Sequence, residues 1–145
     1  MKRGFADIFE TDSVLKTLVL CVLTIGSYLI YKLYRFTSQI NQHTEFKISN
    51  LFITATIVLF VISSGSLIYG LANYNDLTIL KSSIGIHAIS SAFDVTWIVM
   101  VRNRINLITG SNKDDNLWLN PFITSILHVI YIQYKINQGL AKKVI

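Results

Sequence analysis

The sequence predicts an all-α membrane protein, a single domain over residues 1–145 that is built as a bundle of four transmembrane helices. Hydrophobic residues make up 52% of the chain and charged residues only 14%, whereas soluble domains carry about 25% charged residues. Four apolar segments each approach the ~20 residues that a helix needs to cross a membrane. None of them alternates like a barrel strand, and a backbone in lipid must satisfy its own hydrogen bonds, so helices are expected.

The composition also excludes several classes of protein. A disordered chain has a low apolar content, and a secreted disulfide scaffold needs paired cysteines, whereas Cys21 is the only cysteine here. The net charge is +5, but Lys and Arg occur one to three at a time beside apolar runs rather than in one basic patch. We therefore expect membrane lipid as a partner and no nucleic acid.

The first span is expected over residues 14–34. Before it, Phe5, Ile8 and Phe9 are spaced to form one apolar face, either of a short interfacial helix or within a loosely ordered terminus. The span ends in tyrosines and basic residues, which favour the level of the lipid headgroups. Across the chain, the expected interface anchors are Tyr28, Tyr31, Tyr34, Arg35, Trp97 and Trp118.

The second span is expected over residues 51–72 and the third over residues 83–101. Small residues in both spans allow neighbouring helices to approach closely, and the alternative role is a polar lining for a ligand cavity. The residues expected at these helix contacts are Gly65, Ser66, Gly70, Ala88 and Ala92. The third helix is expected to continue beyond the bilayer as far as Thr109, with Gly110 at its C-cap.

The fourth span is expected over residues 117–136, with Pro121 in its first turns and Gly139 at its C-cap. Four spans place both chain ends on one side of the membrane. That side would hold seven of the thirteen basic residues, namely Lys2, Arg3, Lys16, Lys81, Lys135, Lys142 and Lys143. The other side would hold six, so the positive-inside rule does not decide the orientation.

The sequence contains a possible internal repeat. A shift of 65 residues superimposes Ile40-Asn41 on Ile105-Asn106, and residues 51–72 on residues 116–137. Few residues are identical, so the two segments resemble each other in hydropathy and in the positions of their helix ends. This similarity indicates either a duplicated helical hairpin or four evenly spaced helices, and membrane proteins with repeats often carry their functional site at the repeat interface.

One segment carries a resemblance to a known family. Gly26-Ser27-Tyr28-Leu29-Ile30-Tyr31-Lys32-Leu33-Tyr34-Arg35, followed by Asn41, resembles the G-x-Y-x-x-Y-W-x-Y-[K/R]…N signature of a prokaryotic family of small multi-pass membrane proteins. The family is a domain of unknown function, and Lys32 stands where it usually has Trp. The resemblance implies a multi-helix membrane domain from a bacterium or archaeon with cytoplasmic termini, and it implies no reaction.

Polar residues inside the third and fourth spans are the candidates for chemistry, because a charge at mid-bilayer costs about 2.5–3.5 kcal/mol. His87 and Asp94 are seven residues apart and share a helical face, and His128 lies within the fourth span. Their depths along the two spans predict that Asp94 and His128 can pair. The alternatives are a protonated or hydrogen-bonded Asp94 with a structural role, an ion or proton site that includes His87, and haem ligation by His87 and His128.

The sequence contains no phosphate-binding loop, zinc-protease motif or nucleophile elbow. We therefore expect no catalytic residue, no metal and no cofactor. The sequence favours a multi-pass protein of the inner membrane that acts as a structural or accessory subunit, either as a homo-oligomer or with a membrane protein partner. The alternative function is a small channel or transporter that moves protons or ions past Asp94 and His87.

Overall fold

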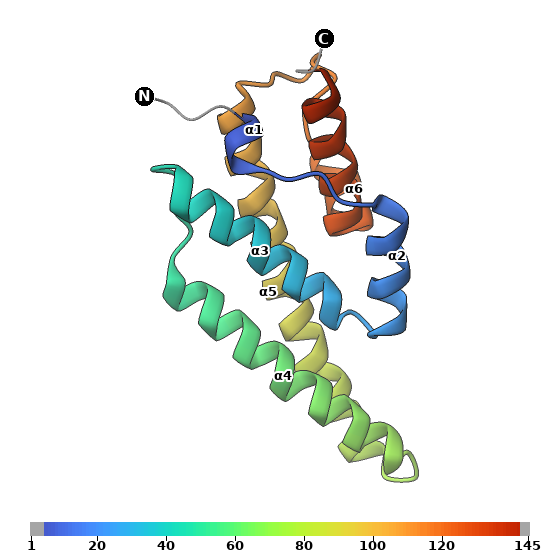
Figure 1. The fold of residues 1–145 in the computed structure, drawn as a ribbon. Helices are drawn as coiled ribbons and strands as arrows, with labels where there is room; N and C mark the ends of the chain where they lie inside the picture. Colours follow the sequence, from blue (N-terminus) through green and yellow to red (C-terminus); the bar gives the residue numbers. More distant parts are fainter. Residues whose placement is uncertain (1–4, 143–145) are drawn as a thin grey trace. The chain divides into compact units, whose positions relative to one another are not determined.

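Helices are the regular secondary structure of residues 5–142, the part of the chain that the computed structural model describes. These residues contain no strand, which confirms the all-α class. Of the basic residues counted for orientation, Lys2, Arg3 and Lys143 lie outside the described part. The helices are α1 (Phe5–Ile8), α2 (Val14–Leu23), α3 (Ser27–His43), α4 (Asn50–Ala72), α5 (Leu77–Thr109) and α6 (Pro121–Lys142) (Figure 1).

The chain divides into two compact units. Unit 1 comprises Met1–Ile48 and Ile98–Ile145, and unit 2 comprises Ser49–Trp97. Whether the whole chain forms the single domain expected from the sequence stays a prediction.

Unit 2 is an antiparallel hairpin of α4 and the first part of α5 (Figure 1). Asp76 caps α5, because its Oδ1 accepts hydrogen bonds from the backbone N–H groups of Thr78 (2.9 Å) and Ile79 (3.2 Å). Near the other end of the hairpin, the rings of Phe52 and Phe93 stack with their centroids 6.2 Å apart. Within residues 5–142, two helices, α4 and α5, are long and apolar enough to cross a membrane. The structure therefore supports the second and third predicted spans.

The first predicted span is not one helix, which corrects the expectation for residues 14–34. Helix α2 ends in a turn at residues 24–26, and α3 begins at Ser27. The N–H of Gly26 donates to Cys21 O (2.9 Å) and that of Ile25 donates to Val22 O (3.2 Å), the pair of bonds that defines a Schellman motif. Ile25 and Gly26 have positive φ angles of 49° and 85°, which end the helix and redirect the chain.

The fourth predicted span begins later than expected and also changes direction. Asn120 caps α6, whose first residue is Pro121, and His128 interrupts the helix with φ 53° and ψ −134°. A carbon placed on Gly139 would lie 3.4 Å from Leu117 Cδ2. A straight helix of this length would hold those two positions about 30 Å apart, so the chain doubles back at His128. Gly139 therefore lies inside α6 rather than at its C-cap.

Helix α1 packs inward within unit 1. Ile8 and Phe9 are buried, and the rings of Phe5 and Phe9 lie with their centroids 5.0 Å apart. A carbon on Gly139 would lie 2.8 Å from Phe5 Cε1, so the missing side chain makes room for α1 against α6. The apolar face expected at the membrane interface thus contributes to the interior of unit 1.

Two asparagines that the 65-residue shift aligns, Asn41 and Asn106, make similar contacts. The Asn41 side chain binds both backbone groups of Ile48, accepting from its N–H (2.8 Å) and donating to its C=O (2.9 Å). Asn106 does the same with Leu119, at 2.9 Å and 3.3 Å. In each case the bound residue directly precedes the N-cap of the next helix, α4 or α6.

The residues around the two asparagines repeat as well. Thr44 Oγ1 donates to Ile40 O (2.8 Å), and Thr109 Oγ1 donates to Ile105 O (3.0 Å). Ile40 and Ile105 are both buried. The similarity does not extend further, because α4 is continuous whereas residues 116–137 contain a loop and a broken helix.

Candidate functional site: a buried cluster around Lys32

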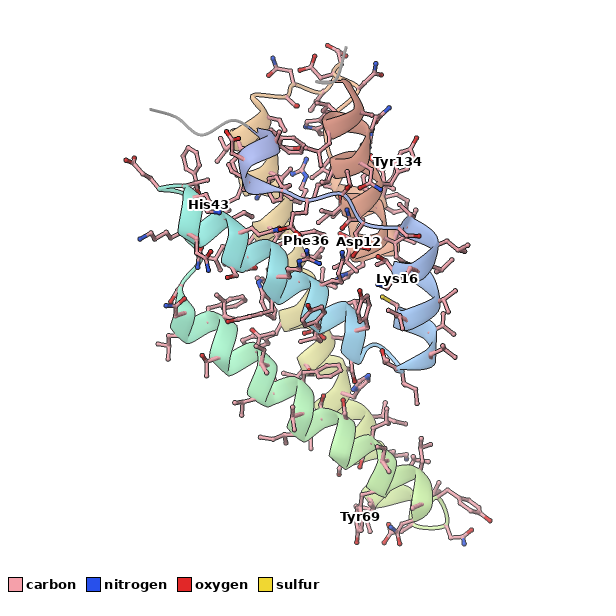
Figure 2. The ribbon with its side chains drawn as sticks, in the orientation of Figure 1. Asp12, Lys16, Phe36, His43, Tyr69 and Tyr134 are labelled. Atoms are coloured by element: carbon pink, nitrogen blue, oxygen red, sulfur yellow. The ribbon has the colours of Figure 1, made fainter. Side chains whose placement is uncertain are left out.

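Three separate segments of unit 1 supply the polar cluster. Lys32 lies on α3, Asp12 lies in the segment between α1 and α2, and Gln133 and Asn137 lie one turn apart on α6. The cluster can be followed in Figure 2 around the labelled Asp12 and Phe36. Ser13 caps α2 by accepting from the N–H of Lys16, which fixes the chain direction immediately after Asp12.

The ammonium group of Lys32 lies at the centre of the cluster. It donates hydrogen bonds to Asp12 Oδ2 (3.0 Å) and Gln133 Oε1 (2.7 Å), and it lies 5.2 Å from the centroid of the Phe36 ring. The Lys32 side chain is 1% exposed and that of Asp12 is 18% exposed. Such a buried charge is tolerated only with a paired carboxylate and good hydrogen bonds, and both are present.

The amides of α6 extend the cluster to the backbone before α2. Gln133 Nε2 donates to Asn137 Oδ1 (2.9 Å) and to Glu10 O (3.3 Å). Asn137 Nδ2 donates to Asp12 O (2.7 Å), and Asn137 Oδ1 accepts from the N–H of Asp12 (3.3 Å). The two amides therefore hold the segment 10–12 against α6.

Arg35 adds a second cation at the exposed rim of the cluster. Its guanidinium group pairs with Glu10, and its Nη1 lies 3.8 Å from Asp12 Oδ2. Burial alone would raise the pKa of Asp12, but the hydrogen bond and charge of Lys32 outweigh it and lower the pKa below the usual 3.8. Asp12 is thus an anion at neutral pH, and the charges of the cluster balance.

This arrangement holds three segments of unit 1 together through paired charges and hydrogen bonds. The Lys32 ammonium group is paired with Asp12, and both carboxylates of the cluster, Glu10 and Asp12, are engaged by basic side chains. Within the described residues, no group of three His, Cys, Asp or Glu side chains is placed to hold a metal ion. The cluster joins α3, α6 and the segment before α2 in one polar network.

Sequence reasoning did not find this cluster. It assigned Lys32 to the membrane boundary and treated it only as a departure from the family signature. A usable signal was present, because Lys32 follows a stretch without charges, and Gln133 and Asn137 lie one turn apart in a mainly apolar segment. Their partner, Asp12, is distant in sequence and could not be identified from spacing.

The predicted polar residues fall in different units. His87 and Asp94 lie on α5 in unit 2, whereas His128 lies at the break of α6 in unit 1. His87 Nδ1, Asp94 Oδ1 and His128 Nδ1 are buried atoms without a hydrogen-bond partner among the described residues. The pairing of Asp94 with His128 stays a prediction.

The predicted small residues divide into two groups. Ser66 Oγ donates to Ser83 Oγ (3.2 Å), and a carbon on Gly70 would lie 2.6 Å from Ser83 Oγ. The other group is exposed on the hairpin and consists of Gly65, Ala88 and Ala92. The buried seam also includes small residues that recur every seven positions, namely Thr56, Ser63 and Gly70 on α4 and Ser83 and Ser90 on α5.

The predicted interface anchors also differ in their surroundings. Tyr31 and Tyr34 are about half exposed on α3, as an anchor requires, whereas Trp97 is completely buried. The Arg102 guanidinium group lies 5.2 Å from the ring centroid of Trp118, which is a cation–π contact. The anchoring role of these residues stays a prediction.

Comparison with protein-family models, with curated proteins and with solved structures gives no significant match. The resemblance of residues 26–41 to a prokaryotic membrane family therefore stays a prediction.

Proposed function

We propose that this chain is a small integral membrane protein, anchored by α4 and the first part of α5, that acts as a structural or accessory subunit of an inner-membrane complex. One observation carries the proposal. Helix α4 exposes large apolar side chains around most of its circumference, and only a narrow strip of it faces α5. The large apolar side chains exposed on α4 are Leu51, Val58, Val61, Ile62, Ile68, Tyr69 and Leu71, with Tyr69 near the end of the helix (Figure 2).

The same pattern continues on the first part of α5, where Ile84, Ile89 and Val95 are exposed. Apolar surface in water costs roughly 25 cal/mol per Å², and the narrow buried strip of α4 recovers little of that cost. In the hydrocarbon core of a membrane, these apolar side chains do not meet water and the cost does not arise. At 1.5 Å per residue, the 23 residues of α4 extend about 35 Å, enough to cross a ~30 Å core.

The seam between the two helices also suits a membrane. Its buried residues include small and hydroxyl-bearing ones, among them Ser63, Gly70 and Ser83. Lipid is as apolar as leucine, so helices in a membrane associate through close packing of small residues and through hydroxyl hydrogen bonds. The exposed Gly65, Ala88 and Ala92 offer the same kind of contact to a further helix. That helix would belong to a second copy or to another membrane protein.

A second candidate function rests on a different observation. His87 Nδ1, Ser90 Oγ and Asp94 Oδ1 are buried and lack hydrogen-bond partners among the described residues, and they follow one another at three- and four-residue spacing on α5. Unpartnered polar atoms in a membrane helix favour a path for protons or ions. In liposomes that hold the purified protein, this function predicts proton flux that Asp94→Asn abolishes.

The leading function is tested by extraction and mass measurement. Membranes that contain the protein are washed with alkaline carbonate and floated on a density gradient, and the retained protein is analysed in detergent by native mass spectrometry. The proposal predicts that the chain floats with the lipid and appears as an oligomer or with a bound partner. A chain that carbonate releases is not an integral membrane protein, and a monomer without flux in liposomes contradicts both functions.

A further inference from the structure

The two ends of each broken apolar segment lie next to each other. At the base of the α2–α3 hairpin, Lys32 Nζ lies 3.0 Å from Asp12 Oδ2. At the base of the α6 hairpin, Lys135 Nζ donates to Asn116 O at 2.5 Å. A segment that crossed the membrane would hold its two ends about 30 Å apart.

The tip of the first hairpin exposes an isoleucine in a costly conformation. Ile25 is 92% exposed and has a φ of 49°, a left-handed conformation that β-branched residues rarely adopt. Gly110 ends α5 through the same Schellman bonds, since its N–H donates to Leu107 O and that of Ser111 donates to Asn106 O, with a φ of 64°. Glycine suits this position in water, whereas Ile25 combines backbone strain with an exposed apolar side chain.

The backbone N–H groups of this tip, from Thr24 to Tyr28, all donate hydrogen bonds within the tip or to the end of α2. Besides the two Schellman bonds, the N–H of Ser27 donates to Thr24 O (3.1 Å) and that of Tyr28 donates to Thr24 Oγ1 (2.9 Å). Thr24 Oγ1 in turn donates to Leu20 O (2.8 Å). Irregular backbone is expensive in hydrocarbon because its polar groups lack partners, and the N–H groups of this turn avoid that cost.

Helix α2 carries an apolar face toward the outside of unit 1. Its exposed apolar residues follow helical spacing and are Leu15, Leu18, Val19 and Val22, with Leu23 beside them, and Lys16 is exposed in its first turn. No charged residue occurs between Lys16 and Lys32. The ten residues of α2 extend about 15 Å, which is half the thickness of the hydrocarbon core.

The distribution of charge identifies the lipid surface as the occupant of this face. If α2–α3 and α6 each enter and leave on one side, the only crossings are α4 and α5. Twelve of the thirteen basic residues then lie on that side, and only Lys81 lies on the other. The positive-inside rule and the anionic cytoplasmic leaflet both favour such an asymmetry, whereas four crossings give seven against six.

We propose that α2 and the turn at Thr24–Gly26 insert into the cytoplasmic leaflet as a re-entrant hairpin, with Ile25 among the acyl chains. The α6 hairpin enters from the same side. This inference rests on the proposed membrane anchoring by α4 and α5, and it replaces the first and fourth predicted spans with segments that do not cross the bilayer.

The test uses the full chain with Cys21→Ser, reconstituted in vesicles of phosphatidylcholine and phosphatidylglycerol. Single cysteines are placed by Ile25→Cys or by Gly110→Cys, a matched control because both positions have the same backbone conformation. Each is labelled with a fluorophore and exposed either to lipids with nitroxide on the acyl chain or to aqueous iodide. We expect the lipid nitroxides to quench position 25 at least several-fold more strongly than position 110, and iodide to do the reverse.

A second measurement separates insertion from crossing. Single cysteines replace the exposed residues Lys16 and Gln42, and an impermeant maleimide is applied to intact cells and to inverted vesicles. The re-entrant hairpin predicts that both positions react only in the inverted vesicles, and reaction from opposite sides overturns it. Carbonate washing of the same vesicles tests the anchor separately. A chain that is retained while iodide quenches position 25 disproves the insertion alone, whereas a chain that is released disproves the proposed function.

Discussion

Asn41 and Asn106 lie 65 residues apart and make the same pair of hydrogen bonds, each to both backbone groups of one later residue. A side-chain amide that binds both the N–H and the C=O of one residue holds the loop at the point where the next helix starts. Thr44 and Thr109 also make matching contacts, and a duplicated helical hairpin stays a prediction. Asn41, the last residue of the family-like signature, has a structural role.

Loss of either asparagine amide should loosen the loop that it holds. Asn41→Ala removes two hydrogen bonds to the backbone of Ile48 and should lower the free energy of unfolding by about 1–3 kcal/mol. Asn106→Ala should have an effect of similar size. Chemical unfolding in detergent, followed by circular dichroism, measures both. An unchanged midpoint for the two variants would contradict the assigned role.

Removal of the Lys32 charge should be strongly destabilising. Lys32→Met leaves Asp12 and Gln133 without their common partner and should cost about 3 kcal/mol. Lys16→Met is the matched control, because it removes the same charge from an exposed position of α2 and should change stability by less than about 0.5 kcal/mol. Combining Lys32→Met with Asp12→Asn should cost less than the sum of the single changes.

The lowered pKa of Asp12 makes stability depend on pH. A carboxyl whose pKa is lower in the folded than in the unfolded chain contributes stability that is present above the unfolded value of about 3.8. That contribution is lost as the pH falls through the folded pKa. When unfolding midpoints are measured at pH values from 7 down to 2.5, the midpoint should therefore decrease once the pH is below about 4. Asp12→Asn should flatten this part of the profile, and an equally steep profile in the variant would assign the effect to other groups.

The two glycines of α4 should respond to alanine in opposite directions. A carbon on Gly70 would lie 2.6 Å from Ser83 Oγ and 2.7 Å from Ser83 Cβ, so Gly70→Ala must push the hairpin apart, at about 1–3 kcal/mol. Gly65 has nothing within 4 Å, and Gly65→Ala should gain up to about 1 kcal/mol of helix propensity. Thermal unfolding in detergent compares them. Equal effects would contradict the packing of this seam.

The parts of the fold that the sequence predicted are those that hydropathy determines. The apolar lengths of residues 51–72 and 83–101 correspond to α4 and to part of α5, and the end of α5 at Thr109 and Gly110 is confirmed. Hydropathy does not report the direction of the chain, so it could not separate a crossing helix from two half-length helices. The breaks occur at Ile25 and His128, residue types that do not usually end helices.

The Lys32 cluster could not be predicted from the sequence for a related reason. Asp12 and Lys32 are recognisable as partners only after α2 has folded back on α3, and Gln133 lies 101 residues beyond Lys32. Sequence spacing identifies groups on one helix, such as His87 and Asp94, but not groups that a turn brings together. Identification of the Lys32 cluster therefore required the tertiary structure, whereas identification of the polar face of α5 did not.

Membrane crossing by the α4–α5 hairpin is tested most directly by the sidedness of its turn. In the Cys21→Ser chain, single cysteines are placed at Asn75, Lys47 or Lys113, and intact cells are treated with an impermeant maleimide before and after permeabilisation. We expect position 75 to react in intact cells, whereas positions 47 and 113 should react only after permeabilisation. Reaction of position 75 under the same condition as positions 47 and 113 would show that α4 and α5 do not cross the membrane, and would contradict the account.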